Sequence, residues 1–597
     1  MNVRRDRTAL AVAGLTLLSL LVRLAFLGNR VAHFDEGRVA YWILDYSETG
    51  VLFYRPIIHG PLLHLLNGPL FGLFGATDFL MRLVPALVGG LLPLVALLFR
   101  HRLRGEAVVS LALLLALNPV LVYYSRFLRG DIIAGGLSFL AFACLVRAVD
   151  FDDGRYLYGA TFALAVGLGA KENVLAYLLA FLGATVLLLH HRLLFARVGD
   201  ETPLAVLWQY LWWAGRGLRR HVGAIGGSVA LFFATVLYVY APRGSLPSQV
   251  TFYKSCAGSS IEGSFEVATA PTLGDALANP LRVPELVAFT FGSTAELFAC
   301  QWVTPRTNDP NPYVEYFGQL AAVTAETSTG LVVLAVAGFL RALYGGDRPD
   351  DLVTFGFYWG AASLVGYPFI TDITGAVWLA VHVVLPLTIP AAYALGALLR
   401  WGREARADED TVSVGLVAVV ALLVVASMGW TTVATSHATP QSDDNPLVQY
   451  AQPGGDLGPT LSEARTLADR NEGTDVVLYG SRLHNPVDDE LERRPTCSSW
   501  FDALPLPWYL EAGDVTADCA PDNESLEGAL AENPPVVVAH ADDRAAVDER
   551  IDDRYDARVH LMRSRDTPFV YYVDESRLDG ADPETPGVAS RRPWRRR

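Results

Sequence analysis

The chain has 597 residues, of which 52% are hydrophobic and 18% charged, with a mean hydropathy of +0.30. These values exclude a disordered chain and an ordinary soluble enzyme, and they are typical of polytopic membrane proteins. The net charge of −15 is uneven: residues 431–597 hold 32 acidic residues against 17 arginines, whereas the first 430 residues hold 30 of each sign. We therefore predict a transmembrane domain at 1–430 and an acidic soluble domain at 431–597.

Eleven apolar segments are long enough to cross about 30 Å of hydrocarbon, which needs roughly 20 residues each. The predicted crossings are 9–27, 79–99, 106–124, 131–149, 156–170, 173–190, 221–241, 326–344, 352–369, 376–398 and 411–430. The segment 61–75 is shorter and contains Gly and Pro, so we expect an interfacial or re-entrant helix there. Residues 204–215 (LAVLWQYLWWAG) have the aromatic pattern of an interfacial helix.

The arginines set the orientation of these crossings, because basic loops stay in the cytoplasm. A cytoplasmic N-terminus places every strongly basic loop on that side. The loops are those that contain residues 4–7, 100–104, 192–197, 216–220 and 400–406. The outer side then holds the loops 28–60 and 242–325 and the acidic domain. We expect a multi-pass protein of the cell membrane whose C-terminal domain is extracellular.

The acidic domain shows the pattern of a small α/β fold. TDVVLYG (474–480), PPVVVAH (534–540) and PFVYYVD (568–574) read as strands, and 459–470 and 541–550 have helical patterning. Four cysteines fall in regions placed outside, so Cys256–Cys300 and Cys497–Cys519 are candidate disulfides, although spacing does not establish either pair.

Lysine is nearly absent, since 45 of the 47 basic residues are arginines. An acid-rich and lysine-poor surface favours a salt-adapted, haloarchaeal source, and a GC-rich genome is the alternative explanation. Under either explanation Lys171, at a predicted membrane boundary, stands out as a retained lysine.

The adjacent acids Asp35 and Glu36, in HFDEGRVAYW (33–42), follow the first crossing. Carboxylates are costly near lipid, so this pair predicts a polar cavity at the outer surface of the membrane. The alternative is a solvated loop in an acidic protein. Two carboxylates there could take a proton from an acceptor or hold a divalent metal ion, and the sequence does not choose between these uses.

Cationic groups are expected on the same side. Arg126 and Arg129 in YYSRFLRGD (123–131) are followed by Asp131, and Lys171 in GAKENV (169–174) is followed by Glu172. Arginine suits phosphate oxygens because its planar fork donates two parallel hydrogen bonds. The alternatives are arginines that extend to lipid headgroups and a structural Lys171–Glu172 pair.

Two histidines complete the candidate substrate-binding set. His59 lies in IIHGP (57–61), and His382 lies on an apolar helix, where a structural core histidine is the usual explanation. The sequence has no HExxH or CxxC motif and no Gly-rich nucleotide loop before a helix, so neither a soluble nucleotide-sugar donor nor a nucleic-acid partner is expected.

The run HFDEGRVAYW…YRPIIHGPLLHLLNGPLFGLFG…MRLVPALVGG (33–90) resembles the opening of the archaeal flippase activity-associated proteins. These are relatives of the protein mannosyltransferases and aminoarabinose transferases in the GT-C superfamily. YYSRFLRGD, AKEN, NPLVQYAQP (445–453) and PLPWYL (505–510) are similar to later motifs of that family. One difference is ITDITGAVW (370–378), where Asp372 stands without the lysine expected before the tryptophan.

The resemblance implies a GT-C-like α-helical membrane protein with a small extracytoplasmic α/β domain. Its first-loop acidic motif falls on Asp35 and Glu36. The function it implies is sugar transfer from a polyprenyl (dolichyl) phosphate-linked donor to a glycan or protein acceptor, in protein N-glycosylation or surface-glycan assembly. The alternative is a non-catalytic factor that assists flipping of dolichyl-phosphate-linked sugars, with a flippase as partner.

Overall fold

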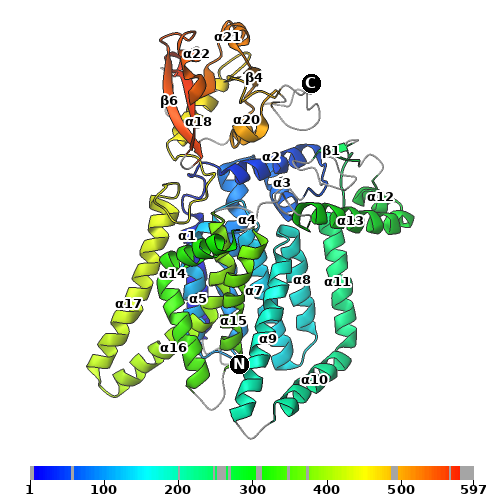
Figure 1. The fold of residues 1–597 in the computed structure, drawn as a ribbon, viewed down its shortest axis with the longest axis vertical. Coiled ribbons are helices and arrows are strands. Elements are labelled where there is room, and N and C mark those ends of the chain that lie inside the picture. The colour runs from blue at the N-terminus through cyan, green and yellow to red at the C-terminus, as the bar shows by residue number, and fades with distance from the viewer. Residues whose placement is uncertain are drawn as a thin grey trace.

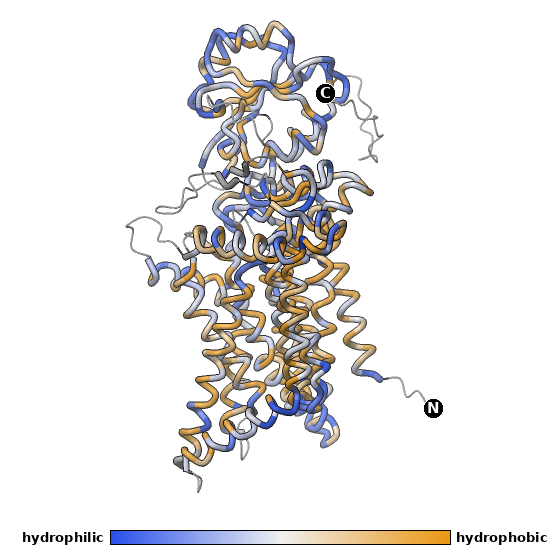
Figure 2. The backbone as a smooth tube through the Cα atoms, turned by 90° about the vertical axis from the view of Figure 1, so that its right-hand side faces the viewer, coloured by the Kyte–Doolittle hydropathy of each residue, from blue (hydrophilic) through white to orange (hydrophobic). Residues whose placement is uncertain are grey.

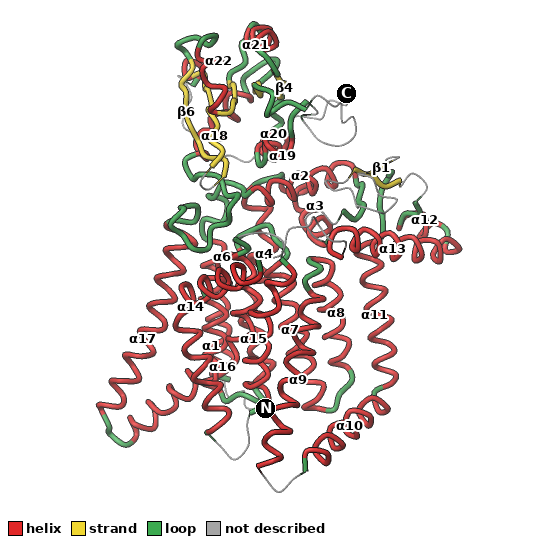
Figure 3. Tube along the Cα trace, in the orientation of Figure 1, coloured by secondary structure: helices red, strands yellow, loops and turns green. Residues whose placement is uncertain are grey.

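The computed structural model describes residues 6–55, 60–198, 202–246, 249–251, 264–266, 270–303, 312–345, 350–371, 375–485, 495, 497–563 and 566–578. The molecule is a long helical bundle with a small sheet-containing domain at one end, shown in Figure 1. Figure 3, in which strands are yellow, shows that the five-stranded sheet lies in that end domain.

The bundle consists of α-helices. They are α1 (Arg7–Leu24), α4 (Asp78–Leu91), α5 (Gly105–Leu117), α6 (Pro119–Ser125), α7 (Asp131–Phe151), α8 (Arg155–Ala170), α9 (Val174–Val198), α11 (Val222–Tyr240), α14 (Tyr313–Tyr344), α15 (Asp351–Ile370), α16 (Ala380–Ala407) and α17 (Thr411–Val433). A 3-10 segment, Leu92–Phe99, extends α4, and another, Val377–Leu379, precedes α16.

The predicted crossings agree with these helices. Within the described residues, eight helices are long and apolar enough to cross a membrane, and the bent pair α5–α6 makes a ninth. The bend of 49° follows Asn118-Pro119, because proline disfavours a helical residue before it. The other two predicted crossings form α8 and α15, which lie in the same bundle (Figure 1). The protein is therefore a multi-pass membrane protein.

Shorter elements lie across the ends of the bundle. They are α2 (Phe34–Thr49), α3 (Leu62–Phe74), α12 (Leu273–Ala278), α13 (Val283–Phe298) and the strands β1 (Gln249–Thr251) and β2 (Ser264–Glu266) on the side of the end domain, and α10 (Pro203–Arg220) on the other side (Figure 1). The predicted interfacial segments 61–75 and 204–215 correspond to α3 and α10. The predicted loop 242–325 contains helices, and α14 begins well before residue 326 and is kinked at Ser328.

The polarity of the backbone separates the two parts. Figure 2 shows a largely hydrophobic bundle, a more hydrophilic end domain and a hydrophilic cluster at the opposite end of the bundle. This pattern is what the transfer cost of polar groups into lipid requires of a membrane-spanning bundle.

The C-terminal domain is built on a mixed sheet. Its strands are β3 (Val476–Tyr479), β4 (Ala517–Ala520), β5 (Val536–His540), β6 (Tyr555–Arg563) and β7 (Asp566–Asp574), in the order β4-β3-β5-β7-β6. β3 pairs parallel to β4 and β5, and β7 pairs antiparallel to β5 and β6. Short helices accompany the sheet: α18 (Leu457–Ala468), α19 (Trp500–Ala503), α20 (Leu506–Ala512), α21 (Asn523–Leu530) and α22 (Arg544–Asp548).

The three predicted strands are confirmed as β3, β5 and β7, which carry continuous buried runs in the sheet. β4 and β6 were not predicted, because both are edge strands with exposed polar positions that weaken the hydrophobic signal. The disulfide Cys497–Cys519 is present and joins the segment before α19 to β4. Cys256 lies outside the described residues, so the pair with Cys300 stays a prediction.

Candidate functional site at the end of the bundle

Glu36 lies in the first turn of α2, and its carboxylate is fully buried. Oε1 accepts hydrogen bonds from Nε of Arg82 at 2.9 Å and from the Leu128 N–H at 2.8 Å. Oε2 accepts from Nη2 of Arg82 at 3.1 Å and lies 2.7 Å from Nη2 of Arg30. Burial favours the neutral acid, but Arg30 and Arg82 outweigh it and hold the pKa of Glu36 below its ordinary value. Glu36 is an ionised anchor that joins α2 to α4.

Asp35 differs from its neighbour because successive helix residues point about 100° apart. Its side chain is 23% exposed, and Oδ2 accepts a hydrogen bond from Nη1 of Arg129 at 2.9 Å. The N–H of Asp35 donates to Nδ1 of His33, which caps the helix. Burial lowers the pKa of His33 to about 3, so this imidazole is neutral near pH 7. Asp35 therefore combines an ion pair with Arg129 and access to solvent.

A second cluster surrounds Asp131, the first residue of α7. Its Oδ1 lies 2.6 Å from Nζ of Lys171, and its Oδ2 accepts from Nε of Arg129 at 3.2 Å. All three side chains are buried, and Arg129 also stacks on the ring of Trp378 at 4.2 Å. The carboxylate offsets the repulsion between the two cations, which keep further N–H donors. The cluster can therefore receive a phosphate.

The predicted residues His382 and Glu172 have defined places beside this cluster. Nε2 of His382 lies 3.1 Å from Oδ1 of Asp131, and its Nδ1 lies 2.6 Å from the hydroxyl of Tyr177. Glu172 follows Lys171, and its Oε1 accepts from the Tyr54 hydroxyl at 2.6 Å. His382 is thus tied to the Asp131 cluster, whereas Glu172 is bound to the loop that follows α2.

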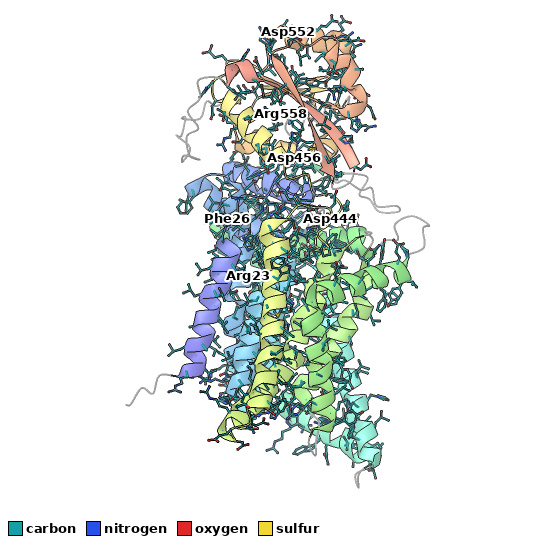
Figure 4. All side chains as sticks on the ribbon, turned by 90° about the vertical axis from the view of Figure 1, so that its left-hand side faces the viewer. Arg23, Phe26, Asp444, Asp456, Asp552 and Arg558 are labelled. Carbon is teal, nitrogen blue, oxygen red and sulfur yellow. A yellow bond between two sulfur atoms is a disulfide. The ribbon has the colours of Figure 1, made fainter. Side chains whose placement is uncertain are left out.

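Arg126 has a different setting from Arg129. Its Nη1 donates to the carbonyls of Arg23 at 2.8 Å and Ala25 at 2.7 Å, and its Nη2 donates to the carbonyl of Phe26 at 3.1 Å. These carbonyls belong to the C-terminal end of α1, where a cation offsets the partial negative charge of the helix. Figure 4 places Phe26 where the bundle meets the C-terminal domain. The structure does not bring Arg126 to Asp131. His59 and Asp372 lie outside the described residues.

The described residues do not assemble a metal site. Among the described residues, no three His, Cys, Asp or Glu side chains are grouped so that they could hold a metal ion. Both oxygens of Glu36 are already occupied by N–H donors, and Asp35 is paired with Arg129. A metal ion on this acidic pair therefore does not fit the observed contacts.

Several site residues were not predicted from the sequence. Arg82 was a recognisable candidate, because it is a charged residue in an apolar span. Arg30 binds Glu36 and stacks on the ring of Phe127 at 3.5 Å. Trp378 and Gln449 both contact Arg129, although they lie far from it in sequence. Nothing in their local sequence indicates these contacts.

The C-terminal domain docks directly on this region through PLPWYL. Nε1 of Trp508 and the hydroxyl of Tyr509 each donate to a carboxylate oxygen of Asp78 at 2.9 Å. The same hydroxyl accepts from the N–H of Ala32 at 2.7 Å. Helix α20 is thereby fixed to the start of α4 and to the loop before α2.

Two family profiles match separate parts of the chain. Residues 58–209 match the dolichyl-phosphate-mannose-protein mannosyltransferase family, and residues 457–574 match the Agl23 flippase-associated protein C-terminal domain. A search of curated proteins finds no match.

Solved structures are similar over nearly the whole chain. The ArnT structure from Cupriavidus metallidurans bound to undecaprenyl phosphate has 14% identity and a TM-score of 0.50, with 96% of this chain and 99% of that chain covered. Its apo state has 15% identity and a TM-score of 0.51, with 97% and 100% covered. The archaeal oligosaccharyltransferase AglB from Archaeoglobus fulgidus, in complex with an inhibitory peptide and a dolichol-phosphate, has 13% identity and a TM-score of 0.49, with 94% and 73% covered.

The similarity to ArnT indicates the fold, and the two family profiles indicate which families residues 58–209 and 457–574 match. The fold is similar to that of the ArnT structures, part of the bundle (58–209) matches the dolichyl-phosphate-mannose-protein mannosyltransferase family, and the end domain (457–574) matches the Agl23 flippase-associated protein C-terminal domain.

Proposed function

We propose that this protein transfers a sugar from a polyprenyl-phosphate-linked donor to a glycan or protein acceptor at the outer surface of the cell membrane. The observation that carries the proposal is the position of Asp35. It is a partly exposed carboxylate whose cationic partner, Arg129, shares Asp131 with Lys171. An acid that can accept a proton thus stands beside cations that can hold a phosphate.

The roles in this reaction follow from the contacts. The nucleophilic atom of the acceptor forms a bond to the anomeric carbon of the sugar, and Asp35 takes the proton that this atom loses. The bond from this carbon to the phosphate oxygen breaks, and its electron pair leaves with the polyprenyl phosphate. Arg129 and Lys171 stabilise the charge that develops on the phosphate. Glu36 positions α2, and Arg126 holds the end of α1.

The outward orientation is part of the proposal. It is supported by the arginine-rich segments 100–104, 216–220 and 400–406 at the end of the bundle opposite the C-terminal domain: the first connects two helices, and the other two lie at the C-terminal ends of α10 and α16. Basic loops are retained in the cytoplasm. The site and the C-terminal domain then face outward, where a flipped lipid-linked sugar would be met.

The test is transfer by an Asp35→Asn variant in membranes supplied with the cell's own lipid-linked sugars. We expect product formation to fall to background while the protein stays folded in the membrane. Glu48→Gln, an exposed position at the far end of the same helix, is the matched control and should retain transfer. Product formation by Asp35→Asn at the wild-type rate would refute the proposal.

A second function is favoured by the flippase-associated C-terminal match at 457–574. In that function the protein assists movement of dolichyl-phosphate sugars without transferring them. Removal of the protein would then trap the charged lipid on the cytoplasmic face. If the protein is a transferase, its removal leaves the lipid-linked sugar on the outer face and the acceptor unmodified, so measuring which leaflet holds the lipid distinguishes the two functions.

A further inference from the structure

The motif NPLVQYAQP (445–453), in the connection between α17 and the C-terminal domain, has no role in the reaction described above. In the structure it packs against the site. The Leu447 carbonyl accepts from the hydroxyl of Tyr124 at 2.7 Å, and Oε1 of Gln452 accepts from Arg30 at 2.8 Å. Figure 4 places Asp444, the residue before the motif, between the bundle and the end domain. This connection is therefore part of the wall of the site.

Gln449 makes the contact that bears on chemistry. Its side chain is buried, and its Oε1 accepts from Nη1 of Arg129 at 2.6 Å. The same nitrogen donates to Asp35, Nε donates to Asp131, and the guanidinium plane rests on Trp378. Four side chains from four separate segments thus fix the orientation of the Arg129 guanidinium plane.

The arrangement leaves one edge of Arg129 for a ligand. Nη2 has no hydrogen-bond acceptor in the part of the chain that the structure describes. Among the described residues Lys171 donates to one acceptor, Asp131, although an ammonium group can donate three hydrogen bonds. These donors, on either side of Asp131, can converge on one phosphate only if the guanidinium keeps its orientation.

We propose that Gln449 is a positioning residue for Arg129, through which the connection to the C-terminal domain takes part in binding the donor's phosphate. The inference rests on the proposed function. The chemistry of the side chain supports it, because Arg129 already pairs with two carboxylates. An amide oxygen can orient the guanidinium without a third negative charge, which would neutralise it further and repel the phosphate.

The test measures binding of undecaprenyl phosphate to the purified full-length protein in detergent. Gln449→Met keeps the length of the side chain and removes the acceptor. We expect its dissociation constant to rise about tenfold, as loss of a hydrogen bond to a charged group predicts. The matched control is Gln441→Met, because Gln441 lies in the same connection, and within the described residues its side chain hydrogen-bonds to backbone atoms of Val31 and Pro453 and not to Arg129. It should bind as the wild type does.

A double-mutant cycle separates positioning from a general structural effect. In an Arg129→Met background, Gln449→Met should weaken binding no further, because the group that it orients is gone. An additional tenfold loss in that background would overturn the inference. So would binding by Gln449→Met at wild-type affinity. Binding by Arg129→Met at wild-type affinity would overturn the proposed function itself.

A second variant covers the case in which Gln449→Met does not fold. Gln449→Glu keeps an oxygen acceptor and adds a negative charge beside Arg129. We expect it to fold and to bind undecaprenyl phosphate more weakly, most clearly at low ionic strength, where the added charge is least screened. Affinity equal to that of the wild type at low salt would contradict the need for a neutral acceptor.

Discussion

We expect neutralisation of Glu36 to destabilise the fold much more than neutralisation of the adjacent Asp35. Glu36→Gln removes the charge that offsets Arg30 and Arg82, and all three side chains are at most 6% exposed. Breaking a buried ion pair by removing one partner costs about 3–5 kcal/mol, because a buried charge is left uncompensated. Asp35 is 23% exposed, so Asp35→Asn should cost about 1 kcal/mol or less.

The assay is unfolding of the detergent-solubilised protein by titration with SDS, followed by tryptophan fluorescence. Glu36→Gln should lower the free energy of unfolding by several times as much as Asp35→Asn, although only Asp35 is proposed to act on the acceptor. Arg82→Met should resemble Glu36→Gln, and the two changes should be strongly non-additive because their side chains are in contact. A Glu36→Gln protein within about 1 kcal/mol of the wild type would refute this account of Glu36.

The pKa of His33 is lowered to about 3 in the fold, against an ordinary value of 6.5, so the unfolded chain takes up a proton that the folded chain does not. The contribution of His33 to the free energy of unfolding is complete above pH 6.5 and should decline by about 1.4 kcal/mol per pH unit below pH 6.5. His33→Asn should remove this pH dependence when unfolding is measured from pH 7 to pH 5. Asp78→Ala leaves a donor on the buried Trp508 and another on the partly buried Tyr509 without their acceptor, and hydrogen exchange should rise in α20 while β3 stays protected. Unchanged exchange in α20 would show that the docking does not depend on Asp78. Replacing both cysteines of the disulfide (Cys497→Ser and Cys519→Ser, 22 residues apart) should destabilise the C-terminal domain by about 3 kcal/mol. Thermal unfolding of the C-terminal domain would test this value.

Much of the fold could be predicted because its signals are local. The apolar runs, the proline after Asn118 and the arginines near the ends of helices each act within a few residues. The buried strands β3, β5 and β7 gave equally local signals. The edge strands β4 and β6 did not, since most of their positions are exposed or only partly buried.

For the site, the sequence alone indicated the segments that we propose to carry chemistry: 33–42, 123–131 and 169–174 each place charged residues at the edge of an apolar span. The partners of each charge depend on the tertiary structure. A rotation of about 100° between neighbours turns Glu36 toward Arg30 and Arg82 and leaves Asp35 toward solvent. Gln449 reaches Arg129 from 320 residues away. The physical reason is that hydropathy is a property of single residues, whereas the state of a buried charge depends on every neighbour that the fold brings to it.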